Sequence, residues 1–224
     1  MNGTDLILIQ PKFRDVAEVY EPIVWKALMS KVREGDIIVD VGAFIGLYTI
    51  ALAKRVGSKG KVIAFEPEPK NFLELNEHIK LNNISDRVEL IQMAVGEKHG
   101  KVFFELSRSC ESRILGIQNE NSTSVECVTL DEIFINKRLD ILKVDVEGYE
   151  EAVLKGAARL LHDPSRAPRA MFIEVHPSMW KDTGTSSESL LTLIRNYGYQ
   201  VHNLDGQETN RIDSYGEIIA SRVF

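Results

Sequence analysis

The sequence contains only two cysteines, Cys110 and Cys127, and they do not form a CxxC pair. Two isolated thiols exclude a disulfide framework and a cysteine-based zinc cluster. We therefore expect both to be ordinary thiols of the fold. The chain has 224 residues, of which 44% are hydrophobic. This length and composition suit one α/β domain with a substantial core.

An excess of positive charge is also missing. Lysine and arginine number 27 against 33 aspartates and glutamates, so the net charge is −6, and a negative protein repels phosphate backbones. We therefore expect no nucleic-acid partner. No apolar run is long enough to span a bilayer, and the amino terminus lacks the basic start and apolar stretch of a secretion signal. These absences predict a cytoplasmic protein with no membrane partner, and they do not specify an oligomeric state.

Strand-like apolar segments alternate with helical periodicity from Asp36 onward, a pattern typical of a parallel sheet with helices on both faces. We expect strands at 36–42, 61–67, 87–95, 140–148 and 169–177, followed by strands in YQVHNLD and GEIIASRVF. Helices are expected after residue 46, around 72–83, at 149–161 and at 187–196. Residues 1–35 are predicted to form an N-terminal extension with a covering helix that begins at Pro22. Residues 36–224 would form the main domain.

The crossover between Gly96 and Leu130 differs from the others in composition. Two short strands are expected there, in KVFFEL and SVECV. They flank a polar stretch at 107–124 that lacks periodicity. We interpret this stretch as a mobile surface excursion that acts as a flap on the side of the site where the substrate, the acceptor, binds.

The end of the first strand, VDVGAFIG, is the first candidate ligand site, because ligands of open α/β sheets bind at the carboxyl ends of the strands. Its glycines, Gly42 and Gly46, have GxxxG spacing. A dinucleotide fold needs a glycine two residues after the first so that pyrophosphate can approach, but Phe44 stands there. S-adenosylmethionine has no phosphate, and its ammonium group would be attracted by Asp40. The turn therefore favours S-adenosylmethionine over NAD.

The second strand ends in Glu66, twenty residues after Gly46. A carboxylate at this position typically accepts both ribose hydroxyls of a nucleoside cofactor. Pro67 then offers a rigid apolar edge for adenine. At the end of the third strand, the backbone amides of Met93 and Ala94, with Gln92 nearby, are expected to read the adenine edge.

Six segments, taken in order, resemble the FkbM family of methyltransferases: VDVGAFIGLYT, IAFEPEPKNF, IQMAVGEKHGKV, VTLDEI, ILKVDVEGYEEAVLKGA and FIEVHP. The resemblance implies a Rossmann-like, seven-stranded methyltransferase sheet over 36–224 whose last strand is antiparallel. It also implies binding of S-adenosylmethionine and transfer of its methyl group to a hydroxyl oxygen of a glycan or small metabolite. The residues expected to contact this cofactor are Asp40, Gly42, Ala43, Phe44, Gly46, Glu66, Pro67, Met93, Ala94 and Asp145. Phe44 departs from the asparagine common in the family, which removes a polar contact to the methionine part.

The candidate reacting centre lies at the ends of the fourth and fifth strands. Asp145 and Glu147 close one strand and Glu174 and His176 the other, and their two-residue spacing puts each pair on one face. Methyl transfer needs an aligned acceptor and a group that removes a proton. We expect His176 to be the general base or acceptor-orienting group. Glu174 would fix the imidazole or help to receive the proton, and Asp145 would border the methionine end of the cofactor.

Other interpretations of these residues remain open. Glu147 can instead cap the following helix, and Glu174 and His176 can be solvated residues at a strand end. Lys143 shares the phase of Asp145, so an ion pair between them is plausible. A divalent metal on Asp145, Glu174 and His176 suits their chemistry, but we favour the arrangement without metal. Met179 and Trp180 are candidates for lining the acceptor pocket.

Two other functions use the same pattern of strand, turn and acid. One is an NAD-dependent oxidoreductase, which Phe44 disfavours. The other is a non-catalytic module that binds a nucleotide-like ligand, which the clustered ionisable residues disfavour.

Overall fold

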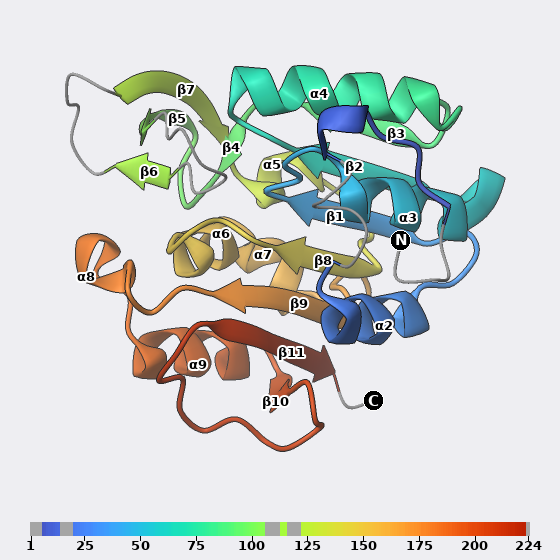
Figure 1. Cartoon of the computed structure of the whole chain (residues 1–224). Helices are drawn as coiled ribbons and strands as arrows, with labels where there is room; N and C mark the ends of the chain where they lie inside the picture. The colour runs from blue at the N-terminus through green and yellow to red at the C-terminus, as the bar shows by residue number, and fades with distance from the viewer. Residues whose placement is uncertain (1–5, 14–19, 106–112, 116–121, 223–224) are drawn as a thin grey trace.

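The computed structural model describes residues 6–13, 20–105, 113–115 and 122–222. Its centre is a seven-stranded sheet in the order β10-β11-β9-β8-β1-β2-β3 (Figure 1). The strands are β1 (Ile37–Val41), β2 (Lys61–Phe65), β3 (Val88–Ile91), β8 (Ile141–Val144), β9 (Ala170–Val175), β10 (Tyr199–Asn203) and β11 (Gly216–Arg222). Only β11 runs antiparallel to its neighbours, β9 and β10. The predicted mostly parallel sheet with an antiparallel last strand is thus confirmed.

Helices pack against both faces of this sheet, as the alternation of segments predicts. One face carries α2 (Pro22–Lys31), α3 (Leu47–Val56) and α4 (Pro69–Leu81). The other carries α5 (Leu130–Ile133), α6 (Glu150–Lys155), α7 (Ala158–His162) and α9 (Ser187–Asn196). Three short helices complete the described part of the chain: η1 (Pro11–Phe13), η2 (Gly57–Lys59) and α8 (Trp180–Thr183).

The predicted covering helix is α2, and it begins at Pro22 as expected. It buries Trp25 and Leu28 in the same apolar cluster as Ile38 of β1. This helix is therefore packed into the core beside the main sheet. Of the helices in the described ranges, none combines the length and apolarity needed to cross a bilayer.

The single helix expected at 149–161 is in fact two, because α6 ends at Lys155 and α7 begins at Ala158. The helix is interrupted at Ala157 (φ −111°, ψ 13°), directly after Gly156. A Cβ atom at this glycine would lie 1.9 Å from the carbonyl oxygen of Gly96, so the chain that follows β4 packs directly against the backbone here. Such a long-range backbone contact leaves no periodic signal in the sequence.

A second sheet, in the order β4-β7-β5-β6, is built from the unusual crossover (Figure 1). Its strands are β4 (Ala94–Val95), β5 (Gly100–Glu105), β6 (Arg113–Leu115) and β7 (Ser122–Val128). Cys127 is buried in this sheet. The predicted excursion at 107–124 therefore contains one strand and the start of another. Its remaining residues, 107–112 and 116–121, lie outside the described residues, so its role as a flap stays a prediction.

Candidate functional site

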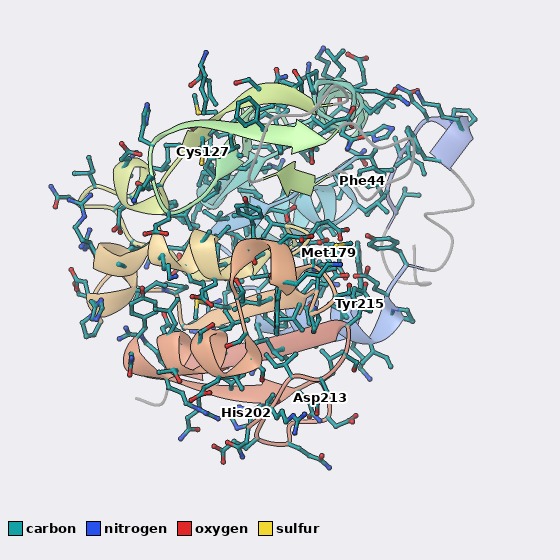
Figure 2. The ribbon with its side chains drawn as sticks, turned by 90° about the vertical axis from the view of Figure 1, so that its left-hand side faces the viewer. Phe44, Cys127, Met179, His202, Asp213 and Tyr215 are labelled. Atoms are coloured by element: carbon teal, nitrogen blue, oxygen red, sulfur yellow. The ribbon has the colours of Figure 1, made fainter. Side chains whose placement is uncertain are left out.

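A cleft of about 560 Å³ opens at the carboxyl ends of the parallel strands. Among the residues that line it are most of those expected from the sequence: Gly42, Phe44, Glu66, Pro67, Met93, Ala94, Asp145, Glu174 and His176. Figure 2 shows Phe44, Met179 and Tyr215 on the same side of the molecule, around this cleft, while Cys127 lies apart in the second sheet. The sequence analysis therefore located the cleft, and the structure adds residues from more distant segments.

The turn after β1 forms one wall of the cleft. Gly42 has φ +83°, and a Cβ atom there would lie 1.8 Å from the carbonyl oxygen of Asp145. Only glycine fits this close approach of two strand ends. Phe44 has φ +50°, a left-handed backbone conformation that is unusual for a bulky residue. Its side chain faces the cleft at the position where a dinucleotide site would keep open space.

Glu66 is the acid at the tip of β2, and its carboxylate is held by backbone groups. Its two oxygens accept hydrogen bonds from the amides of Phe44 at 2.8 Å and Glu68 at 2.9 Å. The residue is only 4% exposed. Burial raises the pKa of Glu66 to about 8, although the two backbone hydrogen bonds act in the opposite direction. The carboxylate is thus fixed in the cleft wall, directly beside the glycine turn.

Three of the expected cofactor contacts, Asp40, Ala43 and Gly46, support this wall from behind and do not line the cleft. Asp40 is 1% exposed and accepts a hydrogen bond from the Thr49 hydroxyl at 2.6 Å. Burial raises the pKa of Asp40, against the opposing effect of Lys143. Asp40 therefore acts on the cleft indirectly, through its electrostatic interaction with the buried Lys143, and not by lining the cleft surface.

Asp145, Glu174 and His176 come together at the opposite side of the cleft. Each offers one nitrogen or oxygen atom, and these atoms all lie within 4.8 Å of one another. Nε2 of His176 is 3.4 Å from Oε2 of Glu147 and 3.8 Å from Oε1 of Glu174. The predicted convergence of ionisable groups from β8 and β9 is therefore present.

Glu150 is a member of this centre that the sequence analysis missed. It is fully buried at the start of α6, and its Oε1 accepts a hydrogen bond from Nδ1 of His176 at 2.8 Å. Its other oxygen accepts from the indole nitrogen of Trp180 at 2.9 Å. Trp180 therefore anchors this carboxylate, while its neighbour Met179 lines the cleft. The only sequence signal was an acid in the first turn of the helix after a strand, which is common at any helix start.

The surroundings of Glu174 and His176 shift the pKa of each group. Burial and the charge of Asp145 raise the pKa of Glu174 to about 7. Burial acts to lower the pKa of His176, but its hydrogen bond to Glu150 and the charge of Glu147 outweigh burial and raise the pKa to about 9. Without a ligand, the imidazole therefore keeps its proton at neutral pH.

Lys143 is a fully buried cation beneath the cluster. Its ammonium group lies 3.3 Å from Oδ2 of Asp145, which confirms the expected ion pair, and 4.7 Å from the centre of the Tyr48 ring. Burial acts to lower the pKa of Lys143, but the charges of Asp145 and Asp40 outweigh it and raise the pKa. This lysine therefore stays charged and partly neutralises the acids around it.

Three further cleft residues come from segments that the sequence analysis did not connect to the site. Tyr20 and Glu21 precede α2, and Tyr215 precedes β11. The hydroxyl of Tyr215 donates a hydrogen bond to Glu174, and its ring centre lies 5.3 Å from that of His176. Tyr215 is 63% exposed, so a large part of its ring is available to a ligand.

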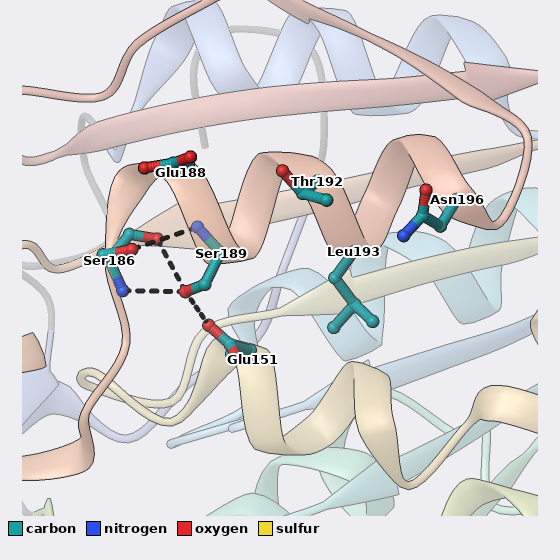
Figure 3. Close-up of a pocket in the computed structure, with 7 residues that line it drawn as sticks. All are labelled: Glu151, Ser186, Glu188, Ser189, Thr192, Leu193 and Asn196. Atoms are coloured by element: carbon teal, nitrogen blue, oxygen red, sulfur yellow. Dashed lines mark hydrogen bonds between the residues drawn. The ribbon is translucent and has the colours of Figure 1, made fainter.

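A second hollow, at the start of α9, has a structural explanation (Figure 3). Ser186 and Ser189 cap the helix reciprocally, because the hydroxyl of each accepts a hydrogen bond from the backbone amide of the other. The Ser189 hydroxyl also donates to Glu151 of α6. These polar groups satisfy one another, so the hollow marks the packing of a helix cap against α6.

With this geometry in place, comparisons with known proteins identify the family. Residues 40–201 match the model of the methyltransferase FkbM domain. The chain belongs to the FkbM methyltransferase family. One relative, the hexuronic acid methyltransferase AglP of Haloferax volcanii, is 28% identical over 163 residues, covering 70% of this chain and 62% of AglP. Methyltransferase sdnD of Sordaria araneosa is 29% identical over 166 residues, covering 57% of this chain and 62% of sdnD. The chain thus spans about three fifths of these relatives.

Solved structures agree with the fold of this FkbM chain. The methyltransferase FkbM from Methylobacillus flagellatus KT superposes with a TM-score of 0.55 at 19% identity, over 83% of this chain and 43% of that one. A putative rRNA-methylase from Clostridium thermocellum has a TM-score of 0.58 at 13% identity, over 89% and 93%. SMU.1697c of Streptococcus mutans, a putative methyltransferase solved with S-adenosylhomocysteine, gives 0.55 at 14%, over 92% and 99%. At such identities the likeness concerns the fold.

Proposed function

We propose that this FkbM chain transfers the methyl group of S-adenosylmethionine to a hydroxyl oxygen of a sugar or another small acceptor. The observation that carries the proposal is the layout of one cleft. A fixed carboxylate, Glu66, stands beside the glycine turn on one side, and Asp145, Glu174 and His176 converge on the other. The first arrangement suits a nucleoside, and the second suits an acceptor that loses a proton.

The cofactor end is assigned to the wall formed by β1, β2 and the segment after β3. Glu66 would accept the ribose hydroxyls, since each of its oxygens has a further lone pair beside the backbone hydrogen bond that it already accepts. Pro67, Met93 and Ala94 would border the adenine, and Asp145 the methionine end. When bound, S-adenosylmethionine supplies an activated methyl group on a sulfonium and leaves as the neutral sulfide.

The acceptor end is assigned to the wall formed by β8, β9 and Tyr215. His176 would orient the acceptor hydroxyl, and the neighbouring carboxylates would receive its proton. The exposed ring of Tyr215 offers an apolar face to a sugar ring. A relative named for hexuronic acid supports a sugar acceptor. The net charge of −6 and the many cleft carboxylates favour a hydroxyl over an acceptor carboxylate, and oppose a nucleic-acid acceptor.

Calorimetric titration tests the cofactor. We expect micromolar binding of S-adenosylmethionine and S-adenosylhomocysteine and no binding of NAD. Binding of NAD without S-adenosylhomocysteine would favour an oxidoreductase and refute the proposal. Binding of S-adenosylmethionine and S-adenosylhomocysteine without methyl transfer to any of a panel of sugars would favour a non-catalytic module.

The bond that is formed can be tested with labelled S-adenosylmethionine and a panel of neutral sugars and hexuronic acids. A methyl ether on a hydroxyl survives mild alkali, whereas a methyl ester on a carboxylate is hydrolysed. We expect label that is stable in alkali. Label that is released by alkali would assign the acceptor group to a carboxylate.

A further inference from the structure

The cluster of Asp145, Glu174 and His176 has the composition of a metal site. Two carboxylates and one imidazole are ligands that suit divalent cations such as Mn²⁺ and Mg²⁺. Their ligand atoms lie within 4.8 Å of one another, and oxygens on opposite sides of a bound Mg²⁺ are about 4.2 Å apart. Three ligands cannot all lie opposite one another, and adjacent oxygens on Mg²⁺ are about 3.0 Å apart, so the side chains would have to rotate and bring their ligand atoms closer by up to roughly 1 to 2 Å.

The second observation lies outside the three residues. Glu150 is completely buried and receives its hydrogen bonds from Trp180, from Nδ1 of His176 and from the amide of Gly148. Because Nδ1 of His176 donates to this carboxylate, the ring is held with Nε2 toward the cleft. A buried carboxylate behind the remote nitrogen of a histidine is the usual support of a metal-bound imidazole.

The direction of Nε2 places this atom where a cation is favoured. With the Nδ1 proton donated to Glu150, Nε2 of neutral His176 would point a lone pair at the carboxylate oxygens of Glu147 and Glu174, at 3.4 and 3.8 Å. Lone pairs facing one another at these distances repel. A cation between them, either a proton on Nε2 or a metal ion, turns the repulsion into attraction.

In the part of the chain that the structure describes, the buried acids around the cluster outnumber the buried cations. Glu217 of β11 lies opposite Glu174 in the strand register, and its Oε1 is buried without a hydrogen-bond partner among the described residues. Lys143 is the buried cation on this part of the sheet, and it is already engaged by Asp145 and the Tyr48 ring. Buried carboxylates in excess of their counter-ions are costly, so a divalent ion in the cluster would stabilise the arrangement.

We propose that Asp145, Glu174 and His176 bind a divalent cation, Mn²⁺ or Mg²⁺, through Nε2 of the histidine and one oxygen of each carboxylate. The sequence alone favours the arrangement without metal, and the buried support of His176 by Glu150 reverses that preference. The other coordination positions of the cation face the cleft, where they can take water or the hydroxyls of a sugar. This last role rests on the proposed methyl transfer, whereas cation binding itself does not.

The test is the binding of Mn²⁺ to the full chain, freed of metal by a chelator and measured without cofactor by loss of the free Mn²⁺ EPR signal. We expect saturable binding of about one ion. Asp145→Asn, Glu174→Gln and His176→Gln should each abolish it or weaken it at least tenfold. Glu150→Gln should weaken it roughly 10- to 100-fold, the usual effect of losing such a support.

The matched control is Glu66→Gln, a change to a carboxylate in the same cleft but on the cofactor side. It should leave Mn²⁺ affinity unchanged and weaken S-adenosylhomocysteine. If a cluster variant does not fold, pulsed EPR of Mn²⁺ on the unaltered protein replaces it, with coupling to a histidine nitrogen as the expected result. Absence of saturable binding at millimolar Mn²⁺, or bound Mn²⁺ without nitrogen coupling, would overturn the proposal.

The outcomes separate this site from the proposed function. S-adenosylhomocysteine binding in the presence of chelator, together with no Mn²⁺ binding, would leave methyl transfer standing and leave His176 as a metal-free group that orients the acceptor. Mn²⁺ binding without S-adenosylhomocysteine binding would keep the cation site and refute the methyltransferase.

Discussion

Glu66 offers the sharpest test of the cofactor assignment. Replacing it with alanine removes a carboxylate that is 4% exposed and is held by the amides of Phe44 and Glu68. If this carboxylate accepts the ribose hydroxyls, the variant loses hydrogen bonds to a charged group, each typically about 1.5 to 3 kcal/mol. Since water partly replaces them, we expect a loss of about 2 kcal/mol, or roughly thirtyfold in the dissociation constant of S-adenosylhomocysteine.

The measurement is calorimetric titration of S-adenosylhomocysteine into the unaltered protein, Glu66→Ala and the near-isosteric Glu66→Gln at a pH above about 8, where Glu66 is ionised. Glutamine keeps one acceptor oxygen, so its affinity should fall between the other two. Circular dichroism melting checks that each variant is folded. Unchanged affinity in a folded Glu66→Ala protein would refute the assignment of the ribose to this residue.

The pH dependence gives a second measure of the same group. Because burial raises the pKa of Glu66 to about 8, the ionised form that best accepts two hydroxyls accumulates only above neutral pH. Affinity should rise by up to about tenfold between pH 7 and pH 9 and stay nearly flat in Glu66→Gln. The stability of the ligand-free protein should change in the opposite direction. Because the pKa of Glu66 is raised, its contribution to stability is lost as the pH rises from the ordinary range of a glutamate toward about 8. If the melting temperature instead rises over this pH range, and Glu66→Gln abolishes that rise, the expected direction is wrong.

Three other predictions concern the support of the cleft and its chemistry. Gly42→Ala should lower the urea midpoint far more than Gly184→Ala, because both have positive φ (+83° and +74°) but only the former would place a Cβ atom 1.8 Å from a backbone oxygen; equal losses would exclude the clash. Lys143→Met should cost about 3 to 5 kcal/mol of stability by leaving buried carboxylates without their cation, whereas Lys26→Met, at an exposed position of α2, should cost less than about 0.5 kcal/mol. His176→Ala should lower turnover roughly a hundredfold to ten-thousandfold with S-adenosylhomocysteine affinity nearly unchanged, and normal turnover would remove it from the reaction.

Much of the site could be predicted because its residues follow directly after buried strands. Gly42, Glu66, Asp145 and His176 each stand at or just beyond the end of an apolar segment, and parallel strands bring such positions to one edge of the sheet. The ion pair of Lys143 followed from the same alternation. Local pattern was sufficient wherever the position along a strand determines the position in space.

The remainder depends on contacts between segments far apart in the chain. Glu150 acquires its role only when α6 packs beside β9, and Tyr215 only when the segment before β11 returns to the cleft. Asp40 was expected at the surface of the site, but Thr49 on the following helix and the buried Lys143 draw it beneath the turn. Periodicity predicts which face of a strand or helix a residue occupies. It does not predict which residue of a distant segment packs against that face.

The two-residue ladder between β4 and β7 has a consequence for how such a chain can vary. Ala94 pairs with Cys127 and Val95 with Val128. This two-residue pairing, the clasp, holds both ends of the long crossover side by side where it leaves the main sheet. Closing a loop costs only slightly more free energy as the loop grows. The crossover can therefore gain or lose residues beyond this clasp while Met93 and Ala94, on its near side, keep their place in the cleft wall. Insertions and deletions are best tolerated there, at the far end of the second sheet.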